Sequence, residues 1–108
     1  MNKDIQVISA LVVEWGNEIE EYVSFSGVGK INATIKTLEV IEKYKPKMII
    51  NYGTAGSQHW KYKKGDLVDC TRFVQRDMDV SGLGFKLGQT PFEEDIPIIL
   101  QSESEFNP

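Results

Sequence analysis

Runs of apolar residues alternate along this chain with polar turns that contain glycine. The most informative run is Met48-Ile49-Ile50, which leads directly into the turn Asn51–Gly56. A short apolar run that ends in turn residues is typical of a buried strand, and we expect this strand to be covered on both faces. Further strands are predicted at Ile5–Val13, which reads as a central strand, at Tyr22–Ser26 and at Leu67–Val74.

The spacing of apolar residues changes to a helical period between the predicted strands at Tyr22–Ser26 and Met48–Ile50. Apolar residues recur every three or four positions from Ile31 to Tyr44, and charged residues fill the opposite side. This pattern predicts an amphipathic helix from about Lys30 to Lys45, which Pro46 ends. A strand, helix, strand order gives parallel strands joined by a right-handed crossover.

Polar groups follow two of the predicted strands at the point where each strand ends. Glu14 comes directly after the apolar run Ile5–Val13. Thr54 follows the run Met48–Ile50 and lies between Gly53 and Gly56. Ligands of open α/β sheets bind at the carboxyl ends of strands, and glycine lets a ligand approach the backbone. A solvated edge carboxylate and a plain strand-exit turn are the alternatives that these residues leave open.

Composition and charge narrow the possible functions. The chain has 108 residues, of which 41% are hydrophobic and 26% charged, as in a soluble domain. A net charge of −4 argues against nucleic acid as a partner, and no apolar run is long enough to span a membrane. Cys70 is the only cysteine, so it forms no internal disulfide, which fits a cytoplasmic setting. We expect Cys70 to be buried.

Two other stretches resemble functional motifs only in part. The turn Gly27–Lys30 lacks the spacing of a phosphate-binding loop and the third glycine of a dinucleotide site. His59, the only histidine, is flanked by aromatic and basic residues, and we interpret it as a loop residue rather than a catalyst. The glycine-rich loop after Val80 carries apolar residues that need a surface to pack on.

Five segments in register resemble the nucleoside phosphorylase superfamily, and within it the methylthioadenosine/S-adenosylhomocysteine nucleosidase branch. They are IQVISALVVE, GVGKINAT, KPKMIINYGTAG, the pair Gly65-Asp66 and RDMDVSGLGFKLGQTP. The resemblance covers roughly residues 5 to 92. It implies an α/β fold with a mixed, twisted, partly barrel-like sheet flanked by helices. We expect one partial domain over 1–108, similar to the N-terminal half of such a nucleosidase, with a frayed tail at 101–108.

The resemblance also implies roles for individual residues. Glu14 matches the catalytic glutamate that holds the attacking water, and no metal or cofactor is expected. A purine nucleoside is the implied ligand. Its contacts would come from Leu11, Val28, Thr54, Ala55 and Gly56. A loop that closes the partner's pocket in family dimers is matched by Val80, Leu83 and Pro91, which implies a homodimer.

Departures from the family pattern limit what the resemblance implies. Phosphorylases of the superfamily carry an arginine near the glycine turn, whereas this chain has Asn51, so we prefer hydrolysis. No residue matches the Met-Glu pair that grips the ribose or the aspartate that protonates the purine. We therefore expect a truncated form that is weak or inactive alone. The alternatives are a nucleoside phosphorylase, a non-catalytic nucleoside-binding or dimerisation remnant, and a bare fragment that associates through exposed core surface.

Overall fold

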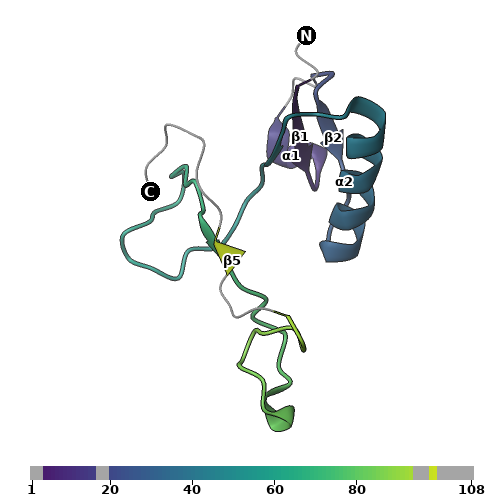
Figure 1. The fold of residues 1–108 in the computed structure, drawn as a ribbon. Coiled ribbons are helices and arrows are strands. Elements are labelled where there is room, and N and C mark those ends of the chain that lie inside the picture. The colour runs from purple at the N-terminus through teal and green to yellow at the C-terminus, as the bar shows by residue number, and fades with distance from the viewer. Residues whose placement is uncertain (1–3, 17–19, 94–97, 100–108) are drawn as a thin grey trace. The chain divides into compact units, whose positions relative to one another are not determined.

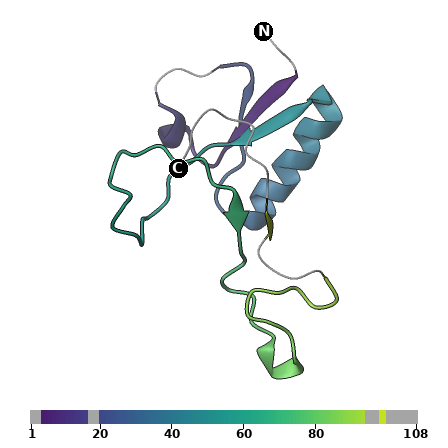
Figure 2. The same ribbon diagram turned by 60° about the vertical axis from the view of Figure 1, so that its left-hand side comes forward.

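The structure is a computed structural model that describes residues 4–16, 20–93 and 98–99. The chain divides into two compact units, Met1–Gly56 and Ser57–Pro108, and each is described separately. Figure 1 shows the elements of both units and Figure 2 gives a second view of the same ribbon. The predicted single domain stays a prediction, and the tail at 101–108 lies outside the described residues.

The first unit is built on a parallel sheet of three strands. β1 (Ile5–Ser9) lies between β2 (Val23–Phe25) and β3 (Met48–Asn51), with Val7 opposite both Val23 and Ile50. The α/β class and the central place of β1 are confirmed. All three strands run the same way, so their carboxyl ends lie at one edge of the sheet.

The central strand β1 is more deeply buried than β3. Gln6 to Ser9 of β1 are all buried, whereas Ile50 of β3 is 43% exposed. The expectation that β3 is covered on both faces is therefore wrong. The physical reason is that helix α2 (Lys30–Tyr44) contacts β1 and β2, so it covers the sheet mainly over those two strands.

The first strand is shorter than predicted. The apolar run from Ile5 to Val13 divides into β1 and the single helical turn α1 (Val12–Trp15). The Glu14 carboxylate accepts a hydrogen bond at 3.1 Å from the Leu11 amide, which precedes the turn. A carboxylate that binds a free amide at a helix start stabilises that start, so the chain leaves the sheet before the apolar run ends.

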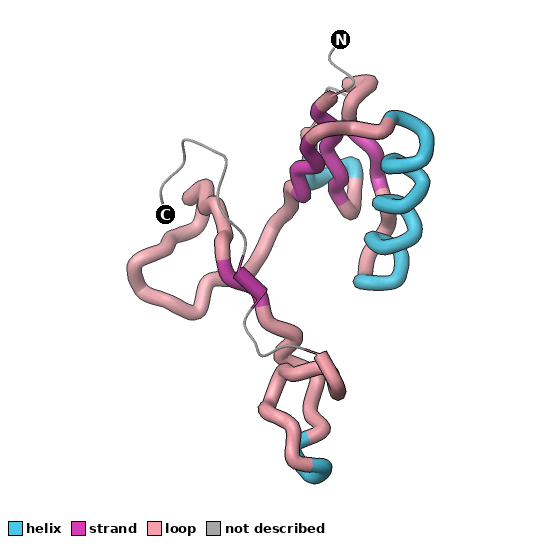
Figure 3. The backbone as a smooth tube through the Cα atoms, viewed as in Figure 1, coloured by secondary structure: helices cyan, strands magenta, loops and turns pink. Residues whose placement is uncertain are grey.

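Helix α2 (Lys30–Tyr44) has the bounds that the periodicity predicts. The Lys45 amide donates to the Ile41 carbonyl at 2.9 Å and caps the helix end; a φ of 46° places Lys45 in the left-handed region, and Pro46 follows. The helix lies beside the sheet (Figures 1 and 3) and contacts β1 and β2.

The face with which α2 meets the sheet differs from its apolar stripe. Val40 is the helix residue that is buried, at 3% exposure, while Ile31 is 78% and Leu38 62% exposed. At 100° per residue, Val40 lies opposite the row formed by Ile31, Ile35 and Leu38. An amphipathic helix ordinarily packs its apolar stripe on the core. In this unit that stripe faces away from the strands that α2 contacts.

The described part of the second unit contains little regular structure. β4 (Arg72–Phe73) pairs antiparallel with β5 (Ile98–Ile99), and η1 (Ser81–Leu83) is a single 3₁₀ turn. The strand predicted at Leu67–Val74 is therefore mostly wrong, because Arg72 and Phe73 are the part of it that forms a strand among the described residues. The burial expected for Cys70 is also wrong, since its side chain is exposed. Among the described residues, no helix is long and apolar enough to cross a membrane.

Candidate active site

Glu14 and Thr54 meet at the edge of the sheet where β1 and β3 end. The Thr54 amide and hydroxyl both donate to Oε2 of Glu14, at 2.8 and 2.9 Å. The two residues are 40 positions apart in sequence but follow adjacent strands, in which Ile8 pairs with Asn51. The structure therefore joins the two groups that the sequence placed at neighbouring strand ends.

These hydrogen bonds favour the ionised form of the Glu14 carboxylate. The Thr54 amide, and next its hydroxyl, lower the pKa of Glu14 below the ordinary value of 4.5, and the Leu11 amide acts in the same direction. Glu14 is ionised at neutral pH, as an ordinary carboxyl is, and these hydrogen bonds strengthen the preference for that form. A carboxylate offers about four lone-pair positions. Three donors reach Glu14 from Thr54 and Leu11, which leaves room for about one more, such as a water molecule.

Gly53 allows the close approach of the two segments. A Cβ atom at this position would lie 3.0 Å from Oε2 of Glu14. The sequence indicated Gly53 as a glycine that lets a ligand approach the turn, but gave it no role toward Glu14. Its place directly before Thr54 was the available signal, but the steric need depends on Glu14, which only the structure brings near.

Three aromatic residues surround the same segments and were also missed. Trp15 meets Tyr52 edge to face at a centroid distance of 5.4 Å and Tyr22 at 6.1 Å. Trp15 follows Glu14, and Tyr52 precedes Gly53 in the turn after β3. The sequence places aromatic residues next to the predicted strands, but it contains no signal that these rings contact one another.

Comparisons with known proteins show the family of this chain. The family profile described as "Phosphorylase superfamily" matches residues 8–104. This chain belongs to the phosphorylase superfamily. The resemblance proposed from the sequence motifs is confirmed.

Two relatives from different organisms carry the same name. The chain is 39% identical over 90 residues to a 5'-methylthioadenosine/S-adenosylhomocysteine nucleosidase of Staphylococcus haemolyticus, covering 83% of this chain and 38% of that protein. It is 42% identical over 66 residues to the protein of the same name from Bacillus cereus strain B4264, covering 61% of this chain and 29% of that one. The chain thus spans 38% or less of the length of these two relatives.

The other family-implied contacts of the first unit lie at the same edge of the sheet. Leu11 precedes α1 and is 44% exposed, and Ala55 and Gly56 are exposed directly after Thr54. Val28 lies in the turn that follows β2 and is 67% exposed. The amide of Gly27 in that turn donates to the Ala10 carbonyl at 2.9 Å, which ties the turn to the exit of β1. Their roles toward a nucleoside stay predictions.

The residues matched to the superfamily's interface loop lie in the second unit. The Leu83 amide donates to the Val80 carbonyl at 2.9 Å, and Leu83 is 77% exposed. Pro91 follows in the same loop and is partly exposed. Their role in closing a partner's pocket stays a prediction.

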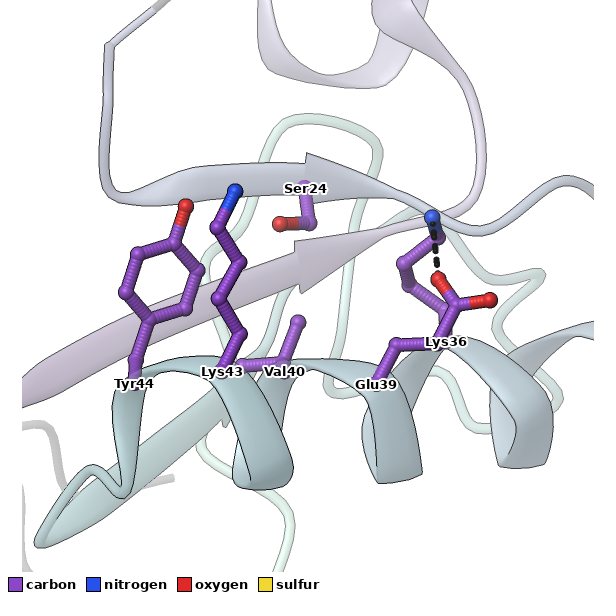
Figure 4. A pocket seen from close by; sticks show the side chains of 6 residues that line it. All are labelled: Ser24, Lys36, Glu39, Val40, Lys43 and Tyr44. Carbon is purple, nitrogen blue, oxygen red and sulfur yellow. Dashed lines mark hydrogen bonds and ion pairs between the residues drawn. The ribbon is translucent and has the colours of Figure 1, made fainter.

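No candidate metal cluster accompanies the pair in the parts of the chain that the structure describes. No group of three or more His, Cys, Asp or Glu residues there could hold a metal ion. His59 lies in a loop, as interpreted, where its Nδ1 accepts from the Lys61 amide at 3.1 Å. A small hollow opens between α2 and β2 (Figure 4), and none of the predicted site residues lines it. Its lining comprises Ser24, Lys36, Glu39, Val40, Lys43 and Tyr44.

Proposed function

We propose that this chain carries the water-orienting part of a nucleosidase site, which hydrolyses the N-glycosidic bond of 5'-methylthioadenosine or S-adenosylhomocysteine. The observation that carries the proposal is the pair of hydrogen bonds from Thr54 to Oε2 of Glu14. Membership of the phosphorylase superfamily and the names of the two relatives support the choice of substrate.

The chemistry of glycosidic hydrolysis suits an ionised and oriented carboxylate. The bond from the anomeric carbon to the purine nitrogen breaks with its electron pair moving to the base, and positive charge develops on the ribose. Water then bonds to the anomeric carbon and releases a proton, while the base takes one up. Glu14 stabilises the positive charge and orients the water through its remaining lone pair.

Water is favoured over phosphate as the nucleophile. Asn51, the last residue of β3, stands where phosphorylases of the superfamily have an arginine. A phosphate dianion needs charged donors, and an amide supplies none. No residue of this sequence matches the aspartate that protonates the purine. Because general acid catalysis contributes about 10²–10⁴ in rate, we expect slow turnover by this chain and easier detection of binding.

The assembly and the setting of the protein are part of the same proposal. We infer a homodimer in which the loop carrying Val80, Leu83 and Pro91 meets the partner's nucleoside pocket. The net charge of −4 makes nucleic acid an unsuitable partner. A single exposed cysteine supports a reducing, cytoplasmic setting.

The test is release of adenine from the two nucleosides, measured by chromatography with and without phosphate, alongside calorimetric binding. We expect phosphate-independent release that falls in Glu14→Gln, and binding that persists. Glu42→Gln, which removes an exposed carboxylate from α2, is the matched control and should behave as the wild type. Phosphate-dependent release would favour a phosphorylase. Binding with no release at any protein concentration would support the non-catalytic alternative.

A further inference from the structure

The segment that carries Glu14 needs support from outside itself. α1 comprises the four residues Val12–Trp15 and has a single helical turn. One turn of helix is unstable on its own, because nucleation costs more than its few hydrogen bonds return. The orientation of Glu14 therefore depends on contacts between α1 and the rest of the first unit.

Trp15 makes such contacts in two directions. Its ring meets Tyr52 edge to face with an interplanar angle of 79°, and it meets Tyr22 at 83°. Edge-to-face pairs of aromatic rings attract each other beyond the effect of burial. The indole therefore lies in contact with both tyrosine rings, which come from segments flanking β3 and β2.

Both tyrosines are held by the backbone of the central strand. The Tyr52 amide donates to the Ile8 carbonyl at 3.0 Å, and the Tyr22 carbonyl accepts from the Val7 amide at 2.8 Å. The aromatic contacts thus connect α1 to the most buried part of the sheet. The contact between Trp15 and Tyr52 joins the same two segments as the contact between Glu14 and Thr54.

We propose that Trp15 is a positioning residue for Glu14, which fixes α1 against Tyr22 and Tyr52 so that the carboxylate reaches the amide and hydroxyl of Thr54. The catalytic meaning of this role rests on the proposed function. The geometric coupling between the indole and the carboxylate does not, and it is tested without a nucleoside.

The experiment is a titration of Glu14 by carbon-13 NMR in the full chain, which reports the hydrogen bonds that the carboxylate accepts. In the wild type the pKa lies below 4.5 because Thr54 donates twice to the ionised form. Trp15→Ala should raise the pKa toward 4.5, and Trp15→Phe, which keeps an aromatic ring, should restore most of the shift. Trp60→Ala removes a tryptophan that is 86% exposed in the second unit and should leave the titration unchanged.

Chemical shifts of α2 and of β1 show whether each variant keeps its fold. If Trp15→Ala does not fold, Tyr52→Leu decides, since it removes one ring contact and keeps the backbone bond to Ile8. It should raise the Glu14 pKa by a smaller amount. An unchanged pKa in folded Trp15→Ala, or in Tyr52→Leu where that variant decides, would overturn the proposal. If the chain released no adenine, the proposed function would fail, but the titration would still test whether Trp15 positions Glu14.

Discussion

Oε2 of Glu14 accepts both the amide and the hydroxyl of Thr54, at 2.8 and 2.9 Å, across 40 positions of sequence. Because two donors of Thr54 bind the same oxygen, they constrain the orientation of the carboxylate as well as its distance from Thr54. The ionised state is stabilised at the same time, because a hydrogen bond to the charged form lowers a pKa. The contact therefore links the end of β1 to the end of β3 and prepares a charged group there.

The hydroxyl and amide bonds of Thr54 can be separated by substitution. Thr54→Val keeps the shape and the amide donor but removes the hydroxyl donor. We expect the pKa of Glu14 to rise part of the way toward 4.5, since the amide is the larger cause of the lowered value. Thr54→Ser, which keeps the hydroxyl, should titrate as the wild type. Equal titration of the valine and serine variants in NMR would show that the hydroxyl bond is not formed.

The lowered pKa of Glu14 makes stability depend on acid. A carboxyl whose pKa is lower in the folded state contributes stability above its unfolded pKa, and loses it as the pH falls through the folded one. Asp79 acts in the same direction, because the Ser81 hydroxyl and amide lower its pKa. The free energy of unfolding should therefore decrease as the pH falls below about 4.5.

Glu14→Gln isolates the contribution of one carboxyl to this dependence. Its free energy of unfolding, measured by urea denaturation from pH 7 to pH 3, should fall less steeply in the acid range than that of the wild type. Glu42→Gln, which removes a carboxylate from an exposed residue of α2, is the control for the change of charge. A Glu14→Gln profile parallel to the wild type would contradict the assignment of the lowered pKa to Glu14.

Gly53 should tolerate no larger side chain without cost to the site. A Cβ atom at 3.0 Å from Oε2 must displace either the carboxylate or the turn. We expect Gly53→Ala to weaken both bonds from Thr54 and to raise the pKa of Glu14. Gly56→Ala is the matched control in the same turn, since apart from Gly56 and its two chain neighbours no atom lies within 4 Å of the added Cβ. If the two variants titrate alike in NMR, the close approach does not require glycine.

The sequence predicted those features that depend on local pattern. The helical period from Ile31 to Tyr44, with Pro46 after it, gave the bounds of α2. Glu14 and the Thr54 turn stood out because each directly follows an apolar run. Such signals lie within a few residues of the element that they define, so one sequence is enough to find them.

Features that depend on distant residues were missed. The position of β3 at an edge follows from strand order, which local pattern does not specify. The early end of β1 was missed for another reason: the bond between Glu14 and the Leu11 amide is local, but it lies in a stretch that reads as continuous strand. The contact of Trp15 with Tyr52 joins residues 37 positions apart, and no periodicity relates them.

The side on which α2 packs gives a last prediction, because its apolar stripe and its buried face differ. Val40 is 3% exposed and Ile31 78%. Val40→Ala should lower the free energy of unfolding by about 1–3 kcal/mol, since it removes buried methyl groups and leaves a cavity. Ile31→Ala removes a larger apolar group from the exposed side and should change stability by no more than about 0.5 kcal/mol. Urea denaturation at neutral pH measures both. A larger loss in Ile31→Ala than in Val40→Ala would mean that the stripe is covered in solution and that α2 packs through it.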